Sequence, residues 1–274
     1  MEAAKTKRET CALSLHQLTV LDATPARLVE LAARTGCPHI CLFTFVPAAA
    51  QGRYPLVTAG DVPALRAQMA HAQVTAANLE VFPLDGREDS DAFARALDVG
   101  AHLGATRATA HIHDIADIDQ AIERFAAFAA LAKRFEIVAG LEFMTFSAIS
   151  GIHDAAHIIR QAGQGALVCD ALHFFRGGDT VSDAAVNADL VSYVQLSDGP
   201  AQCPDDERWA EAVKTRQLPG EGALPLHDLM RVLPGVALVE VEVPRLVDRL
   251  AGKSDLDRAQ DAVDACRAVL TLEA

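Results

Sequence analysis

Four apolar stretches of the sequence end on, or close to, a polar side chain that offers an oxygen. The four residues are Glu142, Asp170, Gln195 and Glu242. A carboxylate among apolar neighbours costs several kcal/mol unless it is paired or binds a cation. Three carboxylates and an amide oxygen suit one hard divalent cation, with Mn²⁺ or Mg²⁺ preferred over Co²⁺ or Zn²⁺. The alternative is a separate salt bridge for each acid, which explains one such residue better than all of them.

The elements that would position these residues alternate along the whole chain. Strand-like runs lie near 12–16, 39–45, 75–82, 106–112, 137–144, 166–174, 190–196 and 236–243. Helical stretches lie near 25–35, 62–72, 91–103, 118–134, 154–162, 182–188, 225–232 and 255–272. Strands that are apolar throughout are typical of parallel sheets covered on both faces. Eight such units predict an α/β fold of the (β/α)₈ (TIM) barrel type.

The sequence raises two alternatives: a barrel against an open sheet, and Glu242 against Glu240 as the metal ligand. No G-x-G-x-x-G turn follows the first run, so the main positive sign of a doubly wound open sheet is missing. Glu240 and Glu242 have the same parity on the last run, and either can face inward. Barrel sites lie at the C-terminal ends of the strands, so we prefer Glu242 as the ligand and expect Glu240 one layer deeper.

Composition limits the function classes. The 274 residues carry a formal net charge of −13, which disfavours a general nucleic-acid binder. No apolar run reaches the roughly 18 residues that a membrane helix needs. Residues 1–10 mix charges without an apolar core, so we expect a short tail and a single domain over 11–274. Six scattered cysteines without a C-x-x-C pair favour the reducing cytoplasm.

Further polar residues fall near the same strand ends and are predicted to bind a small-molecule substrate. They are His16, Glu80, His111, His113, Arg176 and Arg216. The two arginines could hold a carboxylate or phosphate in bidentate geometry. An ordinary surface or salt-bridge role is the alternative for each of the six. The long connection from Ser197 to Ala223 is either a lid or binding loop, or a surface insertion.

With these residues in place, the sequence resembles the xylose-isomerase-like superfamily of sugar phosphate isomerases and epimerases, from His16 to Pro244. The family has metal-binding Glu, Asp, His and Glu residues on strands five to eight, which here match Glu142, Asp170, Gln195 and Glu242. His173 matches a catalytic or substrate-binding histidine of the family, and RQLPGEG at 216–222 resembles its loop before the seventh helix. The resemblance also implies a homodimer.

Gln195 departs from the epimerase pattern, which has histidine there. The segment YVQLSDGP at 193–200 is similar to the bacterial 3-dehydroshikimate dehydratase branch, in which glutamine supplies the ligand oxygen. An amide carbonyl is an acceptable ligand for a hard cation, so the departure leaves the predicted metal site intact. The glutamine at this position does weaken the assignment of the protein as an epimerase.

The chemistry that the resemblance implies is proton abstraction next to a carbonyl, through a metal-bound enediolate, with Glu142, Glu242 and His173 as acid and base groups. The first expectation is an isomerase or epimerase of a sugar or keto-polyol. The alternative is a lyase or dehydratase of a hydroxy-keto substrate, of the 3-dehydroshikimate, inosose or glycoside-cleaving kind. A DNA-repair enzyme of the endonuclease IV type is disfavoured because the second run has no histidine near its end. An inactive barrel serving as a binding subunit is the remaining reading.

Overall fold

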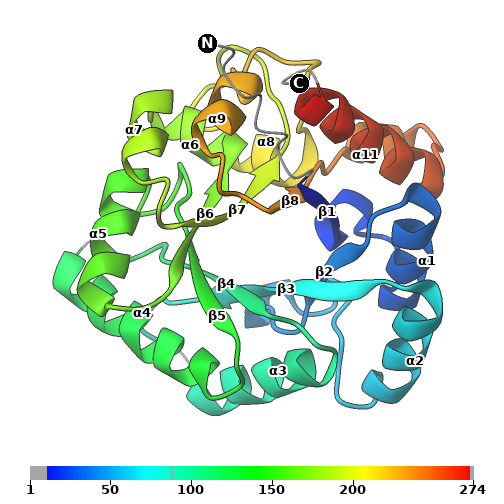
Figure 1. The fold of residues 1–274 in the computed structure, drawn as a ribbon, viewed down its shortest axis with the longest axis horizontal. Coiled ribbons are helices and arrows are strands. Elements are labelled where there is room, and N and C mark those ends of the chain that lie inside the picture. Colours follow the sequence, from blue (N-terminus) through cyan, green and yellow to red (C-terminus); the bar gives the residue numbers. More distant parts are fainter. Residues whose placement is uncertain (1–10, 88, 116, 272–274) are drawn as a thin grey trace, which may run out of the picture.

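The strands close into one barrel. The computed structural model describes residues 11–87, 89–115 and 117–271, so the expected tail at 1–10 lies outside the described residues. All eight neighbouring pairs are parallel, including β8 with β1, and the strands follow one another in sequence order (Figure 1). They are β1 Ala12–His16, β2 His39–Phe43, β3 Thr75–Pro83, β4 Arg107–His111, β5 Val138–Glu142, β6 Ala166–Asp170, β7 Val191–Leu196 and β8 Leu238–Val241. The predicted (β/α)₈ barrel is confirmed.

Helices surround this barrel (Figure 1). They are α1 Pro25–Thr35, α2 Val62–Ala72, α3 Ser90–His102, α4 Ile118–Lys133, α5 Ile152–Ala162, α6 Ala171–Gly177, α7 Val181–Val186, α8 Arg208–Lys214, α9 Leu226–Val232, α10 Leu246–Leu250 and α11 Asp255–Thr271. Short 3₁₀ helices η1 (Gln17–Val20) and η2 (Ala48–Ala50) follow β1 and β2. Several helix starts are capped as their sequences suggest: the Thr24 side chain, for example, accepts from the backbone N–H of Arg27, with Pro25 in the first turn.

The layer between strands and helices forms the main hydrophobic core. The aromatic rings of Phe82 on β3, Phe93 on α3 and Phe128 on α4 meet there, with centroids 5.1 to 5.9 Å apart. Such ring contacts add to the area that each side chain removes from water. Gly100 lets α3 approach β3 closely, since a Cβ at that position would lie 2.0 Å from Leu79 Cδ1.

The interior of the barrel becomes more polar toward the C-terminal ends of the strands. A small apolar cluster of Ala77, Val168, Tyr193 and Leu238 fills part of it. Above it the inward positions carry residues that a barrel core does not need for packing, such as His16, Glu80 and Gln195, all buried. Burial of this many polar groups costs free energy unless they pair with one another or bind a ligand. The polar end of the barrel is therefore where a functional site is expected.

The structure corrects one predicted boundary. The sixth strand was expected to extend through 174, but it ends at Asp170, and 171–177 form α6. Oδ1 of Asp170 accepts from the backbone N–H of His173 and so caps this helix. A short apolar run has no period that separates strand from buried helix, which is why the sequence analysis extended the strand over residues that form a helix. No helix in the described ranges is long and apolar enough to span a membrane.

Candidate metal centre

Strands β5 to β8 bring the four predicted ligands to the C-terminal end of the barrel. Glu142 and Asp170 are the last residues of β5 and β6, Gln195 is the last but one of β7, and Glu242 directly follows β8. Asp170 and Gln195 are register partners on neighbouring strands. Every one of the four is at most 7% exposed. The arrangement places them where active sites of this fold are built.

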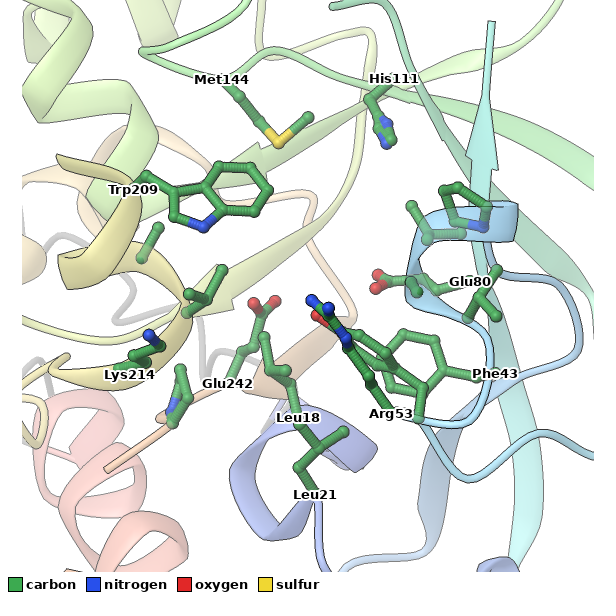
Figure 2. A pocket seen from close by; sticks show the side chains of 18 of the residues that line it. Leu18, Leu21, Phe43, Arg53, Glu80, His111, Met144, Trp209, Lys214 and Glu242 are labelled. Atoms are coloured by element: carbon green, nitrogen blue, oxygen red, sulfur yellow. The ribbon is translucent and has the colours of Figure 1, made fainter. Parts of the chain in front are cut away.

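A cavity of about 920 Å³ opens above them. Glu142 and Glu242 line it, and so do five other predicted site residues: Glu80, His111, His113, His173 and Arg216. Figure 2 shows the carboxylates of Glu80 and Glu242 turned into this space. Asp170 and Gln195 are fully buried and lie behind the cavity surface.

Several polar atoms at this place have no partner. Gln195 Oε1 and Glu242 Oε2 are buried and accept no hydrogen bond from the part of the protein that the structure describes. Leaving such an atom unsatisfied costs about 1–3 kcal/mol, more when it is charged. Oxygen atoms of an amide and carboxylates are the ligands that hard divalent cations take. The donor set therefore fits a divalent ion.

Arg216 links two of the four predicted ligands. Its guanidinium contacts Asp170 Oδ2 through Nη1, and Nη2 lies 2.8 Å from Glu242 Oε1. Nε donates to the carbonyl of Ala212 at 2.8 Å, so the side chain, 3% exposed, is held on three sides. The three acidic ligands and this guanidinium together carry a charge of −2. One divalent cation would neutralise that charge, so Arg216 complements a metal ion here.

Burial and mutual repulsion dominate the electrostatics of these acids. Burial, together with the nearby carboxylates of Glu80 and Glu242, raises the pKa of Glu142 well above its usual range. Burial also raises the pKa of Glu242 to about 7, against the opposing effect of Arg216. Burial would raise the pKa of Asp170 too, but Arg216 holds it below the ordinary value. Without a bound cation, the acids other than Asp170 are poorly compensated.

Three imidazoles form the cavity wall near Glu142. The rings of His111, at the end of β4, and His113 have centroids 4.1 Å apart. Burial lowers the pKa of His173 to about 4 and that of His111 well below its usual range, so both rings are neutral. Nδ1 of each of these two rings is buried without a partner among the described residues. Ligand atoms of His173, Glu142 and Asp170 lie within 4.8 Å of one another.

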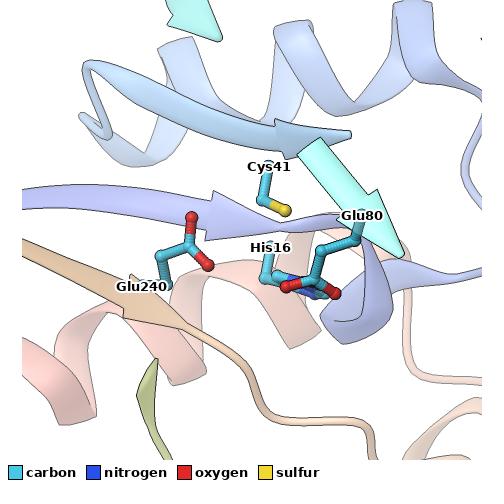
Figure 3. A group of neighbouring side chains, drawn as sticks. All are labelled: His16, Cys41, Glu80 and Glu240. Atoms are coloured by element: carbon cyan, nitrogen blue, oxygen red, sulfur yellow. Dashed lines mark ion pairs between the residues drawn. The ribbon is translucent and has the colours of Figure 1, made fainter. Parts of the chain in front are cut away.

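A second cluster adjoins the predicted ligands and consists of His16, Cys41, Glu80 and Glu240, on β1, β2, β3 and β8 (Figure 3). His16 Nε2 lies 2.8 Å from Glu80 Oε2 and 4.0 Å from Glu242 Oε2. Burial alone would lower the pKa of His16, but the carboxylates of Glu80, Glu242 and Glu240 raise it to about 10. The protonated His16 ring therefore serves as a buried counter-charge.

Glu240 lies in this second cluster, deeper than Glu242, and does not reach the cavity. Its carboxylate accepts from Ser14 Oγ and Asn78 Nδ2, each at 3.4 Å, and from Gln195 Nε2 at 3.5 Å. The Gln195 amide group also donates to Glu80 Oε1 at 3.1 Å. These donors fix the orientation of the Gln195 amide and leave its oxygen free.

Two predicted substrate residues, His16 and Arg176, are not on the cavity surface, and His16 lies in the second cluster. Arg176 on α6 does not line the cavity. Its Nε and Nη2 bond to the Glu211 carboxylate at 2.8 and 2.7 Å, and Nη2 also donates to the carbonyl of Pro200. This pair fastens α6 to α8 and occupies the Arg176 guanidinium, so the geometry does not support the predicted role of Arg176 in holding substrate. Arg216 is likewise bound to protein carboxylates rather than free for an anion.

Asp198 positions the segment that carries Arg216. Its carboxylate accepts from the backbone N–H groups of Gly199, Gly220 and Leu224 at 2.8 to 3.0 Å. The backbones of Asp198 and Gln217 also exchange two hydrogen bonds. Gly222 is required by this close packing, because a Cβ there would lie 2.2 Å from Asp198 Oδ1. The connection from Ser197 to Ala223 is thus held in place by the buried carboxylate of Asp198.

Replacing Asp198 with alanine is therefore expected to lower stability by about 1–3 kcal/mol through the stranded backbone N–H groups. Metal affinity should fall as well, because Arg216 loses its anchor. Urea unfolding and metal titration of Asp198→Ala measure the two effects. Asp198→Asn keeps one acceptor oxygen and should show smaller losses. An unchanged unfolding midpoint for the alanine variant would contradict this role.

Sequence reasoning missed several residues around the site. Asn78, Thr109 and Tyr193 form a buried hydrogen-bonded group under the second cluster. Phe146 packs edge-on against His173 and Trp209, with centroids 5.1 and 4.9 Å apart. Trp209 lies in the long connection from Ser197 to Ala223, and the length of that connection was the one sequence signal that pointed to a cavity wall.

Comparisons with known proteins agree with this architecture. Solved structures with similar folds include the IolI protein with a bound zinc atom (TM-score 0.78, 16% identity, 95% of this chain and 98% of the other covered). D-allulose 3-epimerase from Methylomonas sp. has a TM-score of 0.72 and 13% identity, with 95% of this chain and 98% of the other covered. D-psicose 3-epimerase from Clostridium cellulolyticum H10 has a TM-score of 0.71 and 15% identity, with 94% of this chain and 99% of the other covered. A search of curated protein sequences finds no match. The family described as xylose isomerase-like TIM barrel matches residues 29–269, and the chain belongs to that family.

Proposed function

We propose that the protein is a divalent-metal-dependent isomerase or epimerase that acts on a sugar or keto-polyol by moving a proton next to a carbonyl. The observation that carries this proposal is the pair of buried oxygens that accept no hydrogen bond from the described residues, Gln195 Oε1 and Glu242 Oε2. They lie beside carboxylates whose negative charge Arg216 only partly offsets. The related folds of IolI and of two epimerases support the same class.

Glu142, Asp170, Gln195 and Glu242 would hold the ion, preferably Mn²⁺ or Mg²⁺. The ion would supply Lewis-acid polarisation of the substrate carbonyl. Glu142 and Glu242 come from β5 and β8, three strands apart around the barrel mouth, and both line the cavity. One carboxylate can remove the proton from the carbon beside the carbonyl, and the other can return a proton from a different side.

A second candidate, a lyase or dehydratase of a hydroxy-keto substrate, is favoured by Gln195 and by the histidine wall. Loss of a hydroxyl group needs a proton donor close to the leaving oxygen. The rings of His173 and His111 line the cavity and are neutral, so either can take up the proton removed from the carbon and then, as imidazolium, give it to the leaving hydroxyl. Product analysis separates the two candidates, because dehydration forms a new carbon–carbon double bond that absorbs in the ultraviolet.

Metal analysis of the purified protein is the first test. We expect about one divalent ion per chain in the wild type and none in Glu142→Ala/Asp170→Ala, with the fold retained by circular dichroism. Ketoses, inososes and hydroxy-keto acids are then screened for isomerised or dehydrated products. If the wild type binds no metal, and its melting temperature does not change with added Mn²⁺, Mg²⁺, Co²⁺ or Zn²⁺, the proposal is wrong.

A further inference from the structure

The cavity is lined by more apolar surface than a polyhydroxylated substrate would need. Near β1 and β2 its wall includes Leu18 and Phe43, and on the opposite side Met144 and Trp209 (Figure 2). A hydroxyl that enters such a site without a hydrogen-bond partner loses its interaction with water at a net cost. The walls therefore suit a substrate that turns an apolar face of its carbon skeleton toward them.

The basic residues of the chain are concentrated around this cavity. Its lining contains seven Lys or Arg and six Asp or Glu, whereas the whole chain has 24 and 37. Four of the seven are engaged by carboxylates, namely Arg87 with Asp85, Arg216 with Asp170 and Glu242, Arg245 with Asp248, and Arg258 with Asp22. Arg53, Lys214 and Arg249 make no ion pair within the described ranges. In a protein of net charge −13, three unpaired cations at one cavity call for an anionic ligand.

Two of these cations reach the cavity from different elements. Arg53 comes from the connection between η2 and α2, and Figure 2 shows its side chain extending into the cavity toward Glu80 and Glu242. Lys214 ends α8, five residues after Trp209, and lies on the α8 side in the same view. An arginine fork and a lysine ammonium are the groups that bind carboxylate and phosphate oxygens most strongly.

We propose that the substrate carries an oxyanion, a carboxylate or a phosphate, which Arg53 and Lys214 bind above the metal centre while the apolar walls enclose its carbon skeleton. This inference rests on the proposed function, and it takes the anion-binding role away from Arg176 and Arg216, whose guanidinium groups are already bound by protein carboxylates. The reacting compound is then a hydroxy-carbonyl anion rather than a neutral free sugar.

Trp209 provides a direct readout, since it is the single tryptophan of the chain and lines the cavity beside Lys214. The full-length protein, as purified, is titrated at constant ionic strength with inorganic phosphate, with succinate and with neutral D-fructose while Trp209 fluorescence is followed. We expect a saturable change with one or both anions and a far weaker response to D-fructose. The anion that binds more tightly identifies the source of the oxyanion.

Matched variants locate the binding. Arg53→Gln/Lys214→Gln should weaken the anion response about 10- to 100-fold, as the loss of charge-assisted hydrogen bonds predicts. Arg87→Gln removes a positive charge at the rim of the same cavity. Because Asp85 already pairs with Arg87, this variant should bind the anion as the wild type does. Glu142→Gln should keep the response, which separates binding at the cations from binding to a metal ion. Absence of any saturable anion response, or equal affinity in the double variant, overturns the inference whatever the metal analysis shows.

Discussion

Glu142→Gln is expected to lower turnover by about 10²- to 10⁴-fold, the usual contribution of one acid–base group, while the metal-free protein stays folded. The side chain keeps its shape but loses the charge that would bind the ion. The Glu142 side chain makes no hydrogen bond or ion pair with the residues that the structure describes, so the substitution breaks no such bond, and the backbone pairing of β5 is unaffected. The measurement is turnover of the identified substrate together with metal content.

The same variant should be more stable than the wild type when metal is removed. Burial raises the pKa of Glu142, so the folded state holds a proton where the unfolded carboxyl has lost it. This group therefore lowers stability as pH rises above the ordinary glutamate pKa of about 4.3. The metal-free wild type should lose more stability toward neutral pH than Glu142→Gln does.

Glu123→Gln on α4 makes the same chemical change at an exposed position and is the matched control. It should change neither turnover nor the pH dependence of unfolding by more than the measurement error. Full activity in Glu142→Gln would remove the residue from the reaction. Equal pH dependence in the two variants would mean that Glu142 is not a source of instability.

The barrel and its polar end could be predicted because both follow from local sequence. Each strand is a short apolar run, and Glu142 and Asp170 end their runs at the last strand residue. In a closed parallel barrel all such ends meet at one mouth, so residue position along each run is enough to place the side chain. Glu240 and Glu242 share the inward parity, and their positions along the strand place them in different layers.

The partners of the arginines could not be predicted in this way. Arg176 and Arg216 lie 40 residues apart in connections of irregular length, and each pairs with carboxylates distant in sequence. The Asp198 carboxylate brings Arg216 to Asp170 and Glu242 by binding backbone groups at 220 and 224, which no periodicity reveals. Long-range hydrogen bonds within the loops determine which arginine or lysine side chains pair with protein carboxylates and which do not.

The consequence for function is that the free cations differ from the expected ones. Sequence position assigned the anion-binding role to Arg176 and Arg216, whereas the cavity-lining cations without an ion pair among the described residues are Arg53, Lys214 and Arg249. A buried guanidinium between two carboxylates does not leave them to bind a ligand without a large penalty. The charge arrangement thus separates a structural cation at the metal centre from unpaired cations in the cavity wall.

Arg216→Ala is expected to lower the stability of the metal-free protein by about 3–5 kcal/mol, as the loss of one partner of a buried ion pair does. It leaves the carboxylates of Asp170 and Glu242 unpaired in the interior. Metal affinity should also fall about 10- to 100-fold, the usual effect of removing a group that orients metal ligands. Arg216→Lys keeps the charge but cannot bridge both carboxylates, so it should restore stability more than metal affinity.

Arg176→Ala is the control that separates the two effects. It breaks a less deeply buried pair, with Glu211, away from the cavity, so it should destabilise the protein and leave metal affinity unchanged. Chemical unfolding and competition with a metal chelator measure stability and affinity independently. If Arg216→Ala instead binds metal more tightly than the wild type, the guanidinium occupies the position of the ion and competes with it. An affinity equal to that of the wild type would mean that Asp170 and Glu242 need no guanidinium to be oriented as ligands.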